Sequence, residues 1–437
     1  MSFKILNLLT DRISMIISHS KDYPKTIFNH YLNTFLYVLF QVLLIPIFLN
    51  TFESDKFAFL FFLIGMINFS SIGIGWLSSG LLKSFGENYS NKNYKNVYSI
   101  YKISILLTII YSIFFILCFI ISILFIDKFN INKNDFYLSI FFVSLAIILK
   151  LLTNPDIQFL NSLEKQSTPL KIDNIRLILI ISGVIILKDY FSNVYEVLFL
   201  LTTSILINFF YLKVKTHKFN IFKFKSKINI IKDFQTLLGT RSIKYGIVGF
   251  FIIILQSDLI ILGYLSSPDV IKKYIIVWKI PELIFLLLLK IPASLEPTII
   301  KLAAKKKYKD IEEIHKSFYY YFFVVIFISI VVYYYISDFL IYLWLGTNFS
   351  LNSTETILCC INVFFITSVR WNLAFLHALA KLDFLIKILL LEIILKISLI
   401  IIFIEKFSYM TPIYASTTCH ILLFFWIYSN ARKKIFL

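Results

Sequence analysis

The stretch VYSIYKISILLTIIYSIFFILCFIISILFI, residues 97–126, decides the fold class because it carries a single charge, Lys102. About 20 apolar residues in a helix cross the roughly 30 Å core of a bilayer, so this stretch predicts a transmembrane helix. Similar apolar runs recur along the 437 residues and predict about twelve membrane-spanning helices. The expected spans are residues 29–49, 57–77, 97–126, 136–152, 172–187, 194–212, 243–265, 274–295, 318–343, 356–377, 384–403 and 410–428.

The composition agrees with a membrane protein. Apolar residues make up 59% of the chain and charged residues 16%, and the mean hydropathy is +0.82. Soluble domains contain about a quarter charged residues, so we expect the apolar excess to face lipid. The four cysteines lie in apolar runs without the His/Cys spacing of a zinc site, and we expect neither a metal nor a cofactor. The sequence contains no nucleotide-binding loop and no hydrolase motif, so we expect no enzyme.

The formal net charge of +18 has two interpretations, binding of nucleic acid or a membrane topology. If both termini are cytoplasmic, 33 of the 43 Lys and Arg residues fall in inner segments and only seven in outer segments. Cytoplasmic loops of membrane proteins carry such an excess of basic residues. The charge therefore predicts a multi-pass protein of the cell inner membrane with cytoplasmic termini, and it requires no nucleic acid.

The longest inner loop divides the chain near its middle, with six expected helices on either side. Short acidic outer loops at 52–56 and 265–269 follow the first and seventh expected helices, which hints at a repeat of two lobes. The expected fold is all-α, with two six-helix lobes around a central cavity. Its parts are an interfacial N-terminal segment at 1–28, an N-lobe at 29–212, a cytoplasmic basic linker at 213–242, a C-lobe at 243–430 and a cytoplasmic tail at 431–437.

The eighth expected helix concentrates charge within the bilayer. At 100° per residue, Lys279, Glu282, Lys290 and Glu296 fall on one stripe of this helix. A charge in lipid costs a few kcal/mol or more, so such residues need a partner or a water-filled cavity. We interpret the stripe as the lining of a cavity, and snorkelling towards the membrane surface is the alternative. Asp258 has a depth similar to that of Lys279, which predicts an Asp258–Lys279 pair, either structural or functional.

Three other expected helices carry polar groups. Arg370 and His377 share a stripe near a cytoplasmic helix end, where anchoring at the membrane surface is the alternative to binding. Glu392 and Lys396 are four residues apart, which predicts a pair that satisfies itself. A polar face on the first helix indicates either helix–helix contacts or a binding surface. This face consists of His30, Asn33, Thr34, Tyr37 and Gln41.

Two parts of the chain resemble a known family. Residues 45–49, IPIFL, and 65–75, GMINFSSIGIG, are similar to the first two helices of polysaccharide flippases. Residues 256–264, QSDLIILGY, followed by Lys273-Tyr274, are similar to the family pattern at helices 7 and 8. The chain thus resembles the Wzx-type O-antigen and capsule flippases of the multidrug/oligosaccharidyl-lipid/polysaccharide exporter superfamily. It departs from them where Asn50 and Ser266 occupy outer-loop positions at which the family often has glycine.

The resemblance implies a flippase that moves an undecaprenyl-diphosphate-linked oligosaccharide across the inner membrane by alternating access, driven by an ion gradient. Cationic groups would meet the diphosphate, and polar groups would meet the sugars. The expected substrate-binding residues are Lys279, Lys290, Arg370, His30, Asn33 and Gln41. Asp258 or Glu282 is the expected coupling-ion residue. The expected partners are membrane lipids and a glycan polymerase and chain-length regulator.

Two alternatives remain open at this point. A multidrug or cation antiporter of the same superfamily would need an anionic cavity, whereas the embedded basic residues here at least equal the acidic ones. A non-transporting scaffold of a glycan-export complex is the second alternative. A membrane glycan polymerase is disfavoured because the outer loops are short.

Overall fold

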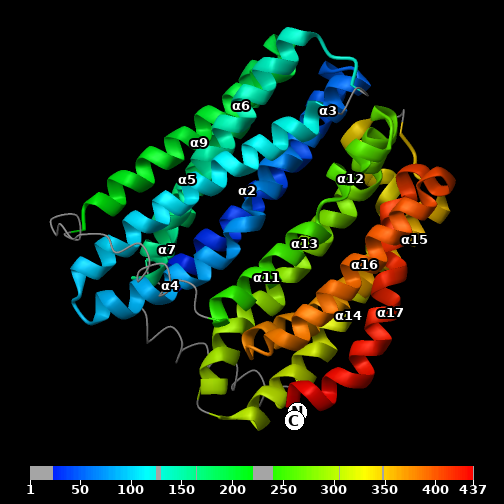
Figure 1. The fold of residues 1–437 in the computed structure, drawn as a ribbon. Coiled ribbons are helices and arrows are strands. Elements are labelled where there is room, and N and C mark those ends of the chain that lie inside the picture. The colour runs from blue at the N-terminus through cyan, green and yellow to red at the C-terminus, as the bar shows by residue number, and fades with distance from the viewer. Residues whose placement is uncertain are drawn as a thin grey trace. The chain divides into compact units, whose positions relative to one another are not determined.

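The computed structural model describes residues 23–124, 129–163, 165–219, 240–304, 306–346 and 349–436, and these residues form helices and no strand (Figure 1). Each expected span coincides with one helix, or with two consecutive helices joined at a break. The all-α, polytopic fold is therefore confirmed. The expected interfacial segment, up to residue 22, and most of the basic linker lie outside the described residues.

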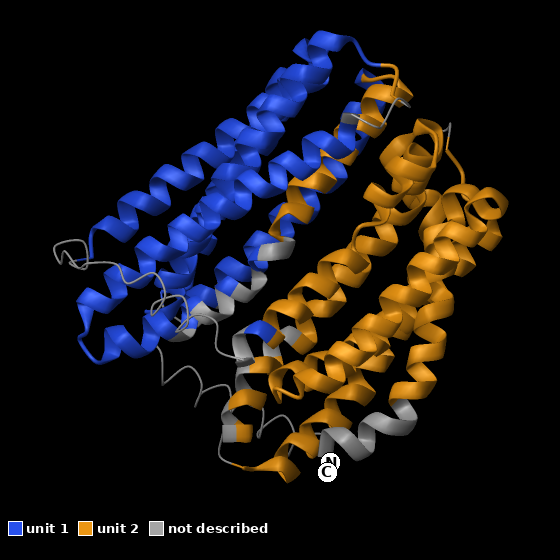
Figure 2. Ribbon diagram, in the orientation of Figure 1, with its two compact units in different colours: residues 1–51, 73–125, 131–243 blue, residues 52–72, 126–130, 244–437 orange. Residues whose placement is uncertain are grey.

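The chain forms two compact units (Figure 2). The first contains α2 (Tyr23–Thr51), α4 (Gly75–Ser90), α5 (Tyr94–Leu124), α6 (Lys133–Leu152), α7 (Asn154–Ser162), α8 (Ser167–Leu187), the 3₁₀ turn η2 (Lys188–Tyr190) and α9 (Val194–His217). The second contains α3 (Ser54–Phe69), most of α11 (Thr240–Leu255), α12 (Asp258–Leu265), α13 (Pro268–Ala304), α14 (Tyr308–Leu345), α15 (Ser353–Ala378), α16 (Leu382–Phe407), η4 (Ser408–Met410) and α17 (Thr411–Phe436).

The unit boundaries differ from the expected lobes, most clearly at residues 52–72. Residues 52–72 group with the second unit, because α3 packs on α12 and α13. The expected cytoplasmic tail at 431–437 is not a separate segment in the described residues, because α17 continues to Phe436. Periodicity along a sequence identifies helices, but it does not say which neighbours a helix packs against.

Six described helices are long and apolar enough to cross a membrane, and a seventh span is formed if the bent pair α11–α12 is counted. The six are Phe28–Thr51, Tyr94–Ile123, Lys133–Ser162, Val194–His217, Tyr308–Leu345 and Ser353–Ala378. The other expected spans fall on helices that are shorter, interrupted or more charged, such as the 16-residue α3. Many large apolar side chains on α5 and α14 are exposed, as is typical of a lipid-facing surface. The protein is therefore a multi-pass membrane protein.

Two expected helices are interrupted rather than continuous. The second expected span consists of α3, a 3₁₀ segment η1 (Ser70–Ile74) and α4, and the Ser70 hydroxyl donates to the carbonyl of Ile67 at 2.7 Å. The seventh expected span bends by 51° between α11 and α12. At this bend the Ser257 hydroxyl donates to the carbonyl of Ile254 at 2.6 Å. A serine that bonds to the preceding turn is a common cause of bent helices.

The eighth expected span is a long helix without an interruption. α13 has 37 residues and passes through Pro281 and Pro292 as a helix. Its flank packs on α15 and α14, where Trp371 and Phe375 are fully buried beside Phe322. The packing of these aromatic side chains gives the second unit a rigid core around its charged residues.

Candidate functional site

The second unit contains a chain of buried polar side chains that joins five helices. It begins at the bend between α11 and α12, where Asp258 is the first residue of α12. Lys396 of α16 lies 2.7 Å from Asp258 Oδ1, and its Nζ also donates to the carbonyl of Leu255 at 2.7 Å. The Tyr274 hydroxyl of α13 donates to Asp258 Oδ2 at 3.0 Å. Lys396 thus binds both the end of α11 and the beginning of α12, and it satisfies a backbone carbonyl that the bend exposes.

The second part of the chain lies one helical turn away along α16. Glu392 is fully buried and accepts two hydrogen bonds from the Arg370 guanidinium of α15, at 2.5 and 3.1 Å. His420 Nε2 of α17 lies 3.0 Å from Glu392 Oε1. Such a bidentate Arg–carboxylate pair is strong and directional. It therefore fixes α15 and α16 around the imidazole of α17.

Two sequence-based expectations about ion pairs are wrong. Asp258 pairs with Lys396 and not with Lys279, and Lys279 binds Glu282 of its own helix at 2.8 Å. Glu392 and Lys396 do not satisfy each other, because each faces a neighbouring helix. A helical spacing of four residues permits a pair on one helix, but stronger partners on α15 and α12 compete for the same charges.

The remaining charges of α13 have different surroundings. Glu296 accepts from His377 Nδ1 at 2.7 Å, and the ring of Tyr245 lies edge-on to that imidazole at 5.0 Å. Lys290 is partly buried, and no described residue forms an ion pair or hydrogen bond with it. It is therefore the embedded cation of α13 whose charge is not balanced.

The polar face of the first helix lies in the first unit. Asn33 donates to Asp173 of α8 at 2.8 Å, and Arg176 donates to the same carboxylate at 2.6 Å. Gln41 is buried, whereas His30 is exposed. Part of this face thus serves helix–helix contacts between α2 and α8, which is one of the two interpretations left open by the sequence.

Several buried polar residues were not singled out from the sequence. His420 and Tyr274 belong to the chain in the second unit, and in the first unit Tyr101, Asp156 and Lys213 join α5, α7 and α9 with distances of 2.7–2.8 Å. The signal for His420 was weak but present. It follows Ser416 by four residues in an otherwise apolar helix, a spacing that places both on one face.

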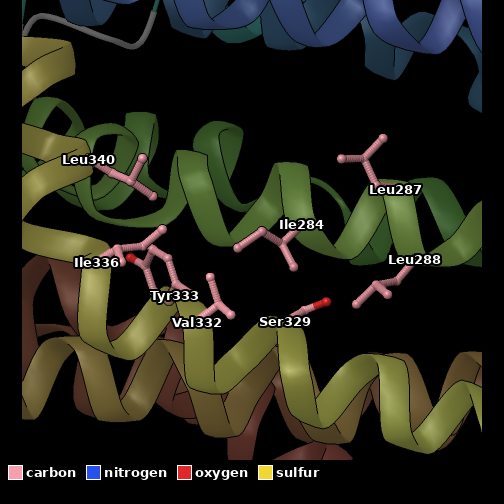
Figure 3. A pocket seen from close by; sticks show the side chains of 8 residues that line it. All are labelled: Ile284, Leu287, Leu288, Ser329, Val332, Tyr333, Ile336 and Leu340. Atoms are coloured by element: carbon pink, nitrogen blue, oxygen red, sulfur yellow. The ribbon is translucent and has the colours of Figure 1, made fainter.

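A groove of about 330 Å³ lies between α13 and α14, as Figure 3 shows. Its lining is mainly aliphatic, with two polar side chains, Ser329 and Tyr333. The hydroxyl of Tyr333 is buried and has no hydrogen-bond partner among the described residues. The groove suits an apolar chain better than a polar headgroup.

The comparisons with solved structures show which known fold the chain has. The chain resembles the lipid II flippase MurJ in an inward closed conformation, with a TM-score of 0.69 and 15% identity over 94% of this chain and 88% of that one. It also resembles an inward-facing multidrug resistance MATE family transporter of the MOP superfamily, with a TM-score of 0.67 and 12% identity over 94% and 98% of the two chains.

A third similar structure is a MOP superfamily transporter from Pyrococcus furiosus that has a binding pocket of reversed polarity, with a TM-score of 0.62 and 11% identity over 94% of each chain. No protein-family model and no curated protein matches the chain. These identities show the fold alone, which is the fold of MATE transporters and of the flippase MurJ. The neighbours named here are transporters and a flippase rather than enzymes, and the chain shares their fold.

Proposed function

We propose that the protein is an inner-membrane flippase that moves undecaprenyl-diphosphate-linked oligosaccharide repeat units, of the O-antigen or capsule type, by alternating access. The supporting observation is a charge balance. Within the expected spans 243–265, 274–295, 356–377 and 384–403, every acidic residue has a basic partner. The basic residues of these spans that have no acidic partner among the described residues include Lys290, which is partly buried, and Lys387, which is exposed. The balance favours an anionic substrate, because a diphosphate supplies the missing charge.

The charge balance also separates this function from its main rival. A multidrug antiporter has an equally well supported fold, since MATE transporters are among the similar structures. An organic cation would require a carboxylate that is free to receive it. Asp258, Glu282 and Glu392 are each held by a basic side chain, so a cation would have to displace a lysine or an arginine.

The proposed substrate contacts follow from these pairs. Lys290 is available to the diphosphate in the conformation described. Lys279 and Arg370 would also bind the diphosphate, once phosphate oxygens replace Glu282 and Glu392 as their partners. The sugars would meet the polar groups of α2, which are His30, Asn33 and Gln41. An isoprenoid tail would lie in the groove between α13 and α14.

The proposed coupling ion acts at Asp258 or Glu282. Protonation of either carboxylate would release the lysine bound to it, Lys396 or Lys279, and so alter the contacts of α16 or α13. The protein would work beside a glycan polymerase and a chain-length regulator, which consume the translocated repeat unit.

The test is complementation of a bacterial strain that lacks its own polysaccharide flippase, with surface glycan and accumulated lipid-linked glycan as readouts. We expect the full chain to restore surface glycan, and Lys290→Ala to abolish this restoration at unchanged protein level. Lys290→Arg should keep most of it. Lys387→Ala is the matched control, because Lys387 is an exposed lysine of α16. Full export by Lys290→Ala would contradict the proposed role of charge.

A further inference from the structure

The contacts of His420 define a position for one exchangeable proton. The ring nitrogen Nδ1 lies 2.6 Å from the backbone carbonyl of Ser416, which can only accept a hydrogen bond. Nδ1 must therefore carry a hydrogen. The Ser416 hydroxyl is compatible with this tautomer, because it donates to Asn362 Oδ1 at 3.1 Å and keeps a lone pair directed at the ring.

The second ring nitrogen also faces an acceptor. Nε2 lies 3.0 Å from Glu392 Oε1, and no described residue forms a hydrogen bond with it. A neutral Nε2 and an ionised carboxylate can both only accept hydrogen bonds, so without a further proton neither atom satisfies the other. With Nδ1 protonated, one additional proton on Nε2 or Oε1 would turn this buried contact into a hydrogen bond.

We infer that His420 and Glu392 form a buried proton-binding site between α17 and α16, and that the exchange of this proton is coupled to transport. The proton lies on Nε2, giving an imidazolium and a carboxylate, or on Oε1, giving a neutral pair. In both cases the site gains one positive charge on binding and loses it on release. The coupling of this proton to transport rests on the proposed flippase function. The existence of the proton-binding site does not.

The surrounding charges explain why the proton would be exchangeable rather than permanent. The positive charges of Arg370 of α15 and Lys396 of α16 oppose a further positive charge at His420, while Glu392 favours it. Glu392 already balances Arg370, and Lys396 is balanced by Asp258. The protonated site therefore has one uncompensated charge in a medium of low dielectric constant, which an anionic substrate could compensate.

Release of the proton has a mechanical consequence. Without it, two atoms that can only accept hydrogen bonds lie 3.0 Å apart, which favours movement of the imidazole away from Glu392. Glu392 is anchored to α15 by two hydrogen bonds and His420 to its own helix by one. The separation is therefore expected to change the packing of α17 against α16 and α15, which would couple the proton to a helix movement.

The first experiment tests the site without a substrate. The full chain is purified, placed in lipid nanodiscs and labelled with ¹⁵N in its six histidines. At about pH 8, above the ordinary histidine pKa of about 6.5, we expect either one doubly protonated ring in the nitrogen spectrum or one protonated carboxyl in the infrared spectrum. The feature should disappear in His420→Gln and in Glu392→Gln.

The chain offers a matched control for this measurement. His377 and Glu296 form a similar pair at 2.7 Å, but both side chains are about one-third exposed. His377→Gln should leave the protonated feature unchanged. The wild-type spectrum needs no variant and decides the question even if a substitution prevents folding. A neutral histidine population together with ionised glutamates at this pH would overturn the inference.

The second experiment tests the coupling, with undecaprenyl diphosphate as the probe. Calorimetric titrations in two buffers of different ionisation enthalpy give the number of protons exchanged on binding. At a pH at which the spectra show the free site to be largely deprotonated, we expect uptake approaching one proton for the wild type and none for His420→Gln, which should still bind the probe. Binding without proton exchange in the wild type would overturn the coupling. Absence of binding would instead contradict the proposed flippase function, and the spectra would still decide whether the site exists.

Discussion

At the scale of single residues, the second unit compensates its embedded charges pair by pair. Asp258 and Lys396 are both nearly buried, with side chains 16% and 7% exposed. Two charges at this depth remain stable together because each replaces the water that the other has lost. The Lys279–Glu282 pair is more accessible, with Glu282 33% exposed, and water screens part of its charge.

This difference predicts unequal effects of breaking the two pairs. Lys396→Met leaves Asp258 as an uncompensated charge and should destabilise the protein by about 3–5 kcal/mol. The double variant Asp258→Asn/Lys396→Met should recover much of this loss. The stabilities of the single and the double variant are measured by thermal unfolding in detergent and by the protein level in membranes. The control Glu282→Gln should cost about 1 kcal/mol or less. Equal losses in Lys396→Met and Glu282→Gln would contradict the assignment of Asp258 to Lys396.

At the scale of helices, one close contact determines how α3 packs against α12. A Cβ atom at Gly263 would collide with the ring of Phe62 of α3, whereas a Cβ atom at Gly65 would meet Ile260 and Leu259 at 3.8 and 3.9 Å. Only the first glycine is required by the packing. Interfaces between membrane helices often use small residues in this way, because they allow close approach of the backbones.

Gly263→Ala should therefore destabilise the protein by about 1–3 kcal/mol, the usual cost of overpacking a close contact. Gly65→Ala should change stability little, since its new methyl group fits at ordinary contact distance. Thermal unfolding of the two variants in the same detergent gives the comparison. Phe62→Leu introduced into Gly263→Ala should restore part of the loss. A Gly263→Ala protein as stable as the wild type would show that α3 does not pack on α12 in this way.

The sequence predicted where helices form, but it did not predict where they are interrupted. The apolar runs at 57–77 and 243–265 predicted single helices, whereas the structure divides each at a serine-containing segment. By contrast, α13 continues as a helix through Pro281 and Pro292, residues that usually kink or break a helix. Hydropathy reports the length of chain that lipid can accept, whereas a break depends on which neighbouring groups satisfy the freed backbone atoms.

At the scale of the whole molecule, the basic residues predict the topology. Both termini and the loop 213–244 should be cytoplasmic, because inner segments carry most of the Lys and Arg residues. The location of these segments can be measured with reporter proteins that are active in only one compartment, fused at Leu437 and after Asn220. Fusions in the expected outer loop 265–269 provide the control of opposite sign. Activity of a periplasmic reporter at either cytoplasmic position would refute the topology.

The sequence by itself determined the membrane class, the positions of about twelve apolar spans and the embedded basic residues that at least equal the acidic ones, because these depend on local composition. The tertiary structure alone decided which charges meet. Asp258 belongs with Lys396 and Tyr274, Glu392 with Arg370 and His420, and Lys290 has no such partner among the described residues. One sequence allows many pairings at similar depth, and only the packing of α12, α13, α15, α16 and α17 brings particular side chains within bonding distance.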